Sequence, residues 1–127
     1  MMKTNPVVWF ELYVADMARA RKFYEAVLGV KLEQAEAMEG DWPEMWMFPG
    51  EENANGACGA LVKMEGMSPG SGGTLVYFSC DDCAEQARRV VASGGQLVRD
   101  KFAIGPYGFI ALAVDTEGNM IGLHSIS

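Results

Sequence analysis

An internal repeat is the feature of this sequence that most constrains its fold. With an offset of 66, the two halves agree at a strand, at a helix start and at a helix stop; the aligned pairs are Trp9 with Leu75, Glu11 with Tyr77, Asp16 with Asp82, and Gly29 with Gly95. Near the end of each half the offset becomes 63, which pairs Gly59 with Gly122 and Leu61 with His124. The repeat predicts two tandem β-α-β-β-β units in one α+β chain.

Residues 9–32 show how each unit begins. Alternation puts Trp9, Glu11 and Tyr13 on one face of a strand and apolar residues on the other. Asp16 is a suitable N-cap for the helix that follows, and Gly29 fits the left-handed position that ends it. The apolar stripe of this helix is predicted to contain Ala20, Phe23, Tyr24, Val27 and Leu28.

Glycine, serine and proline dominate residues 66–73, which favours this segment as a linker. We expect one domain, 1–127, with a first unit at about 5–65 and a second at about 74–127. Strands are predicted in the first unit at 30–36, 43–49 and 57–64, and in the second at 74–80, 96–102, 107–114 and 120–126. Turns are predicted at 37–41 and 51–56.

Composition and charge narrow the class of function. The chain has 127 residues, half of them hydrophobic, which suffices for one core. A net charge of −7 opposes binding to nucleic acid or to an anionic membrane. No apolar run approaches the roughly 20 residues of a membrane span, and the start MMKTNPVVW lacks the apolar segment of a signal peptide. Three cysteines do not make a disulfide framework, so we expect a reduced, cytoplasmic protein.

The openings VVWFELYVADMARARKFYEAVLGVKL and TLVYFSCDD and the closing DTEGNMIGLHS resemble the vicinal oxygen chelate superfamily. Its members include glyoxalase I, bleomycin-resistance proteins and extradiol dioxygenases, and MWMFPG and GALVK are similar to a glyoxalase-related branch. The likeness covers essentially the whole chain. It implies a cupped, barrel-like mixed sheet with helices outside, a small organic molecule as the ligand, and a homodimer.

The resemblance also implies positions for divalent-metal ligands, which fall here on Trp9, on Gly59 or Ala60, on Leu75, and on Gly122. None of these side chains can bind a metal, and the chain has one histidine. We therefore predict no metal site and no cofactor. A divalent metal would need a displaced ligand set, such as Glu11 and His124 with waters or a partner's carboxylate.

Strand parity yields the candidate catalytic residues Glu11, Tyr77 and His124, because they share faces with Trp9, Leu75 and Gly122 respectively. A histidine acts as acid or base near pH 7, and a carboxylate can fix its tautomer. In the alternative reading, Glu11 only accepts a hydrogen bond from the backbone or Tyr77, and His124 is a satisfied strand-end residue. The candidate ligand-binding residues are the aromatics Trp9, Tyr13, Trp46, Phe48, Tyr107 and Phe109, which at strand spacing also suit a core.

Three functions remain open from the sequence. The leading hypothesis is a metal-free, small-molecule-binding member of the superfamily that sequesters a partly apolar ligand or performs acid-base chemistry on it. The second is a divalent-metal-dependent lyase, isomerase or dioxygenase with displaced ligands. The third is a non-enzymatic structural or interaction module. Cys80 and Cys83 form a C-x-x-C pair, but neighbouring Asp81 and Asp82 disfavour a reactive thiolate.

Overall fold

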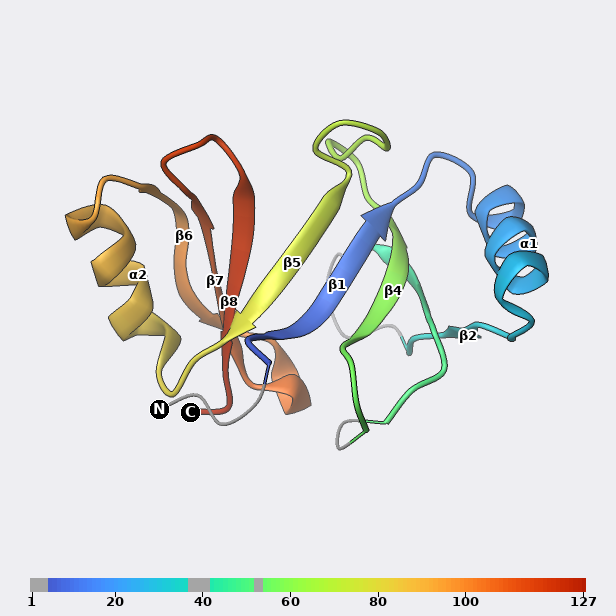
Figure 1. Ribbon diagram of the computed structural model, residues 1–127, viewed down its shortest axis with the longest axis horizontal. Coiled ribbons are helices and arrows are strands. Elements are labelled where there is room, and N and C mark those ends of the chain that lie inside the picture. The colour runs from blue at the N-terminus through green and yellow to red at the C-terminus, as the bar shows by residue number, and fades with distance from the viewer. Residues whose placement is uncertain (1–4, 37–41, 52–53) are drawn as a thin grey trace. The chain divides into compact units, whose positions relative to one another are not determined.

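The structure of the protein is a computed structural model that describes residues 5–36, 42–51 and 54–127. Its contacts divide the chain into two compact units, residues 9–74 and residues 75–127 together with the residues up to Val8. Within the described ranges, each unit contains one α-helix and four strands (Figure 1). The α+β class and the two tandem β-α-β-β-β units are confirmed.

The first unit starts from a parallel strand pair. Its elements are β1 (Val7–Tyr13), α1 (Met17–Leu28), β2 (Glu33–Gln34), β3 (Glu44–Met47) and β4 (Cys58–Lys63). Its sheet order is β2-β3-β4-β1, in which β1 runs parallel to β4 and the other pairs are antiparallel. The helix is the crossover that a parallel pair requires.

The second unit repeats this plan. Its elements are β5 (Thr74–Ser79), α2 (Cys83–Ala92), β6 (Gln96–Ala103), the 3₁₀ turn η1 (Gly105–Tyr107), β7 (Phe109–Val114) and β8 (Met120–Ser125). The order β5-β8-β7-β6 again places the first strand parallel to the last, which Figure 1 shows as neighbouring ribbons. Each unit therefore has a parallel pair whose two strands come from its beginning and its end.

Both helices begin at the predicted N-caps, but only α1 ends at the predicted glycine. The side chain of Asp16 accepts a hydrogen bond from the Arg19 amide, and that of Asp82 accepts one from the Ala84 amide. Gly29 ends α1 in the left-handed conformation, with φ 66°. After α2 the residue with positive φ is Gly94, at 98°, so the predicted match of Gly29 with Gly95 is wrong by one residue.

One face of each unit's sheet packs against the helix of that unit. The residues buried in these two cores show which offset relates the end of the first unit to the end of the second. In the first unit Leu61 is buried with Met17 of α1, and in the second Leu123 is buried with Cys83 of α2. Leu61 therefore corresponds to Leu123, an offset of 62. The offset of 63 is wrong because it sends Leu61 to His124, whose side chain lies on the opposite face of its strand.

The apolar stripe of α1 is narrower than predicted. Met17, Ala20 and Tyr24 belong to the core cluster, and they follow one line along the helix. Phe23, Val27 and Leu28 are all more than half exposed. The prediction failed because apolar residues covered a wider arc of the helix than the sheet of this unit contacts.

Some sequence predictions concern residues that the structure does not describe, and others differ in extent from what it shows. The turn at 37–41 and part of the turn at 51–56 lie outside the described residues. The strand predicted at 30–36 is only Glu33–Gln34. None of the described helices combines the length and apolar character needed to cross a membrane. The cupped arrangement of both units together stays a prediction.

Candidate functional site

The first unit holds a buried carboxylate on β1. Glu11 is 8% exposed and is the only buried carboxylate among the described residues. Its Oε1 accepts a hydrogen bond of 2.5 Å from the Tyr13 hydroxyl, and its Oε2 accepts one of 3.1 Å from the Trp9 indole. The i, i+2 spacing of a strand puts all three side chains on one face. The carboxylate is thus held from both sides by donors of its own strand.

These two hydrogen bonds determine whether an ionised Glu11 side chain is stable in its buried position. An ionised carboxylate away from water is strongly disfavoured unless donors replace its hydration. Charge-assisted hydrogen bonds are shorter and stronger than neutral ones, which fits the 2.5 Å contact with Tyr13. Each oxygen has more than one lone pair, so the carboxylate can accept a further proton or hydrogen bond. The predicted trio of Trp9, Glu11 and Tyr13 is therefore brought together.

The register of β1 against β4 fixes which residue occupies the superfamily's metal position on β4. Glu11 pairs with Ala60, whereas Gly59 pairs with Phe10 on the helix side. A Cβ on Gly59 would collide with the Phe10 ring. The four positions are therefore Trp9, Ala60, Leu75 and Gly122, and their side chains offer no donor for a divalent metal. Among the described residues no cluster of three His, Cys, Asp or Glu forms either.

In the second unit Tyr77 covers a glycine of the neighbouring strand. Tyr77 pairs with Gly122, and a Cβ on this glycine would lie 2.7 Å from Cγ of the Tyr77 ring. Tyr77 is 7% exposed, so its ring is packed over the β8 backbone. The glycine is what permits this close approach of ring and strand.

His124 lies on the same face of its strand pair, next to Ser79 in register. Its Nε2 is 2.6 Å from the backbone carbonyl oxygen of Tyr107 in the turn η1. Because a carbonyl oxygen can only accept, Nε2 must carry a hydrogen. In neutral His124 the other nitrogen, Nδ1, is then the basic one. Glu11 and His124 belong to different units, and their predicted pairing stays a prediction.

The remaining candidate aromatics make contacts within their own units. Trp46 and Phe48 pack with the helix-side core of the first unit, and Phe109 packs with that of the second. The guanidinium of Arg21 lies 3.4 Å from the centre of the Trp46 ring. Tyr107 is 54% exposed and contributes its carbonyl rather than its ring to the contact with His124. Ligand contact by these four side chains stays a prediction.

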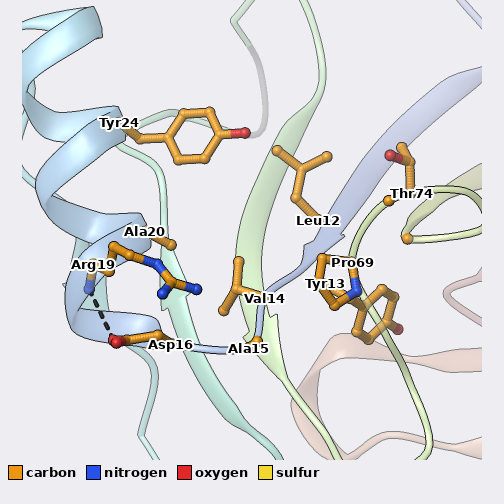
Figure 2. A pocket seen from close by; sticks show the side chains of 12 residues that line it. Leu12, Tyr13, Val14, Ala15, Asp16, Arg19, Ala20, Tyr24, Pro69 and Thr74 are labelled. Carbon is orange, nitrogen blue, oxygen red and sulfur yellow. Dashed lines mark hydrogen bonds between the residues drawn. The ribbon is translucent and has the colours of Figure 1, made fainter.

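Sequence reasoning missed a hollow of about 390 Å³ in the first unit (Figure 2). It lies where β1 runs into α1, and its lining includes Leu12, Val14, Arg19, Tyr24 and Pro69. No motif marks it, because its wall combines the end of β1, the start of α1 and residues 69–74, most of which belong to the predicted linker 66–73. The only sequence signal for this hollow is Arg19, a cationic side chain close to the junction between β1 and α1.

The C-x-x-C pair has the environment of inert thiols. Cys80 packs against the core of the second unit, and Cys83 is fully buried there. Burial raises the pKa of the Cys80 thiol, and the neighbouring Cys83 and Asp81 raise that pKa further. A thiol with a raised pKa is a poor nucleophile near neutral pH, which agrees with the sequence-based interpretation.

Fold and site together define a duplicated β-α-β-β-β protein with polar groups on the sheet faces opposite its helices. Residues 7–123 match the family model of the Glyoxalase/Bleomycin resistance protein/Dioxygenase superfamily. The chain belongs to this superfamily, as the resemblance of its motifs implied.

Two sequence relatives, both named Putative glyoxylase CFP32, come from Mycobacterium bovis and Mycobacterium tuberculosis. Each is 29% identical over 117 residues, which is 91% of this chain and 42% of the relative. The chain thus spans about two fifths of the length of these relatives.

Solved structures share the fold at low sequence identity. Methylmalonyl-CoA epimerase from Mycobacterium tuberculosis has a TM-score of 0.67 at 16% identity, covering 100% of this chain and 93% of that chain. The hypothetical protein BH1468 from Bacillus halodurans C-125 has a TM-score of 0.70 at 16% identity, covering 97% and 95%. At this identity the likeness concerns the fold alone.

Proposed function

We propose that this protein binds a small, partly apolar organic molecule and that Glu11 is its acid-base group, acting without a metal. The observation that carries the proposal is the buried Glu11 carboxylate, held by Tyr13 and Trp9. Buried, oriented carboxylates are disfavoured by desolvation, and they concentrate at functional sites. Trp9 would add an aromatic surface beside the carboxylate.

The chemistry we propose is transfer of a proton to and from a carbon atom next to a carbonyl. The Glu11 carboxylate takes the proton, the substrate keeps the electron pair as an enolate, and the proton then returns to the same carbon. The similarity to solved methylmalonyl-CoA epimerases, some in complex with CoA thioesters, supports this class of substrate. His124 and Tyr77 remain proposed acid-base groups of the other unit.

Deuterium exchange tests the chemistry. Chelator-treated protein in D₂O is incubated with methylmalonyl-CoA, and loss of the α-proton is followed by NMR. Glu11→Gln keeps the shape of the side chain and one acceptor oxygen but removes the base, so exchange should fall by about 10² or more. Glu44→Gln is a matched control, because Glu44 also accepts from the indole of a tryptophan two residues away but is exposed.

Binding is measured separately by calorimetry with methylmalonyl-CoA and with anilinonaphthalene sulfonate as an apolar probe. Binding without exchange would reject catalysis and leave sequestration as the function. Exchange that survives in Glu11→Gln would reject Glu11 as the base. Failure of both probes to bind at millimolar concentration would contradict the proposed ligand class.

Two expectations from the sequence belong to the same proposal. We place the protein in the cytoplasm and propose a homodimer, because unpaired strand edges and the exposed α1 residues Phe23 and Val27 favour association. Sedimentation equilibrium tests the oligomer, and a single species at 13.8 kDa would contradict it.

A further inference from the structure

The hollow at the start of α1 lies mainly on the other side of β1 from the Glu11 carboxylate, and Tyr13, which donates a hydrogen bond to Glu11, is part of its lining. Leu12 and Val14 line it from the helix side of β1, and both pack against the helix-side core. The carboxylate of Glu11 lies on the opposite face of the same strand. A volume of about 390 Å³ falls within the range of small-molecule sites.

The wall of the hollow is held in place by backbone hydrogen bonds. The Tyr13 amide donates to the Gly73 carbonyl at 2.8 Å, and the Gly73 amide donates to the Gly70 carbonyl at 2.8 Å. Gly70 adopts a φ of 88°, which a side chain would disfavour. The segment carrying Pro69 is thus tied to the end of β1, so this side of the hollow is formed before any ligand arrives.

One cation lines this hollow without a partner. In the part of the chain that the structure describes, the Arg19 guanidinium makes no hydrogen bond and no ion pair, whereas Arg21 of the same helix pairs with Glu25. Figure 2 shows Arg19 and Tyr24 extending from α1 toward the end of β1. Asp16, the one carboxylate of the lining, accepts the hydrogen bond that caps α1.

We propose that this hollow binds a small organic monocarboxylate with an apolar body. A guanidinium matches the two oxygens of a carboxylate, and Leu12, Val14 and Pro69 would cover the apolar part. A phosphate fits this hollow less well than a monocarboxylate, because the Asp16 carboxylate lies in the same wall and repels a multiply charged anion. The ligand class is therefore an aromatic or aliphatic acid rather than a phosphate.

Benzoate is the probe for this site. It is titrated into the full ¹⁵N-labelled chain while the amides of Ala15, Ala20 and Gly70 are followed by NMR. Arg19→Gln should weaken binding on the order of tenfold, and Arg19→Lys should weaken it less because the charge remains. Lys22→Gln removes the same charge from another exposed position of α1 and should leave the affinity within about twofold.

Two further ligands complete the test. Benzyl alcohol keeps the ring without the charge and acetate keeps the charge without the ring, so both should bind more weakly than benzoate. Equal binding of benzyl alcohol, unchanged affinity in Arg19→Gln, or no shifts at these amides would overturn the site. Benzoate binding is read at the amides of the hollow and deuterium exchange is read on the substrate, so failure here and failure of the proposed function are distinguishable.

Discussion

The two units pack the helix side of their sheets in the same way but carry different chemistry on the opposite face. On the helix side, Leu61 of β4 and Leu123 of β8 occupy corresponding positions in the two cores. On the opposite face, the corresponding residues Glu11 and Tyr77 are a carboxylate and a phenol. Packing against the helix restricts the helix-side face to apolar residues, whereas the residue types on the opposite face can differ between the units.

The difference extends to how the polar groups are oriented. Glu11 accepts hydrogen bonds from Trp9 and Tyr13, two side chains of its own strand. His124 is held by the backbone carbonyl of Tyr107, which lies 17 residues earlier in the chain. The first arrangement depends on strand spacing, and the second depends on a turn. Mutations should therefore affect the two groups in different ways.

The largest expected effect is on the corresponding cores. Leu61→Ala and Leu123→Ala should each lower the free energy of unfolding by about 2–5 kcal/mol, because each removes buried methyl groups and leaves a cavity. Urea denaturation followed by circular dichroism measures both. Leu28→Ala, at a position 55% exposed, is the control and should stay within about 0.5 kcal/mol. If only one of the two variants lost this much unfolding free energy, Leu61 and Leu123 would not be equivalent core positions.

A smaller loss is expected on the polar face. Glu11→Ala leaves the Tyr13 hydroxyl and the Trp9 indole without the acceptor they share, and should cost about 1–3 kcal/mol. Glu44→Ala removes the exposed acceptor of Trp46 and should cost less than about 0.5 kcal/mol. The same urea titrations measure the difference. Equal losses would show that burial of Glu11 has no energetic consequence.

Acid should destabilise the second unit through its helix cap. The hydrogen bond from Lys101 holds the pKa of the Asp82 carboxyl below its ordinary value of 3.8, and the Ala84 amide lowers that pKa further. The folded state therefore binds this proton less readily than the unfolded state. The resulting stability is present above pH 3.8 and is lost as the pH falls through the lowered pKa.

Asp82→Asn should therefore flatten the acid limb of the curve of unfolding free energy against pH. Lys101→Met should flatten it in part, since the amide of Ala84 still bonds the carboxylate. Some slope should remain in both variants, because Asn119 lowers the pKa of Asp115. An unchanged acid limb in Asp82→Asn would refute the role of this cap.

The smallest effect is spectroscopic and concerns His124. The chain has one histidine, so its ring nitrogens can be assigned in ¹⁵N NMR spectra without ambiguity. When the ring is neutral, the spectrum should show the tautomer with hydrogen on Nε2, because Nε2 donates to the Tyr107 carbonyl. Hydrogen on Nδ1 would show that this contact is not maintained in solution.

Local signals accounted for most of the fold. The caps Asp16 and Asp82 were predictable because an aspartate before an apolar stripe is a strong helix start. The trio around Glu11 was predictable for a similar reason, because strand parity alone places i and i+2 together. Each of these inferences needs only a few consecutive residues.

What depends on contacts between distant segments was not predictable. The offset of 62 required the register of parallel strands, which the loops between them do not reveal. The hollow beside Arg19 required the position of segment 69–74 against β1. The contact between His124 and Tyr107 depends on the turn η1, which brings the Tyr107 carbonyl to a residue 17 positions later in the chain.

The packing of the Tyr77 ring over Gly122 restricts which substitutions position 122 can accept during evolution. A glutamate or histidine at position 122 would need a Cβ where the ring now lies, so a single substitution would force the ring out of its packed place. A smaller residue would first have to replace Tyr77. Acquiring a metal ligand at this position therefore requires two substitutions in a fixed order, which is an epistatic barrier between this chain and the metal-binding members of its superfamily.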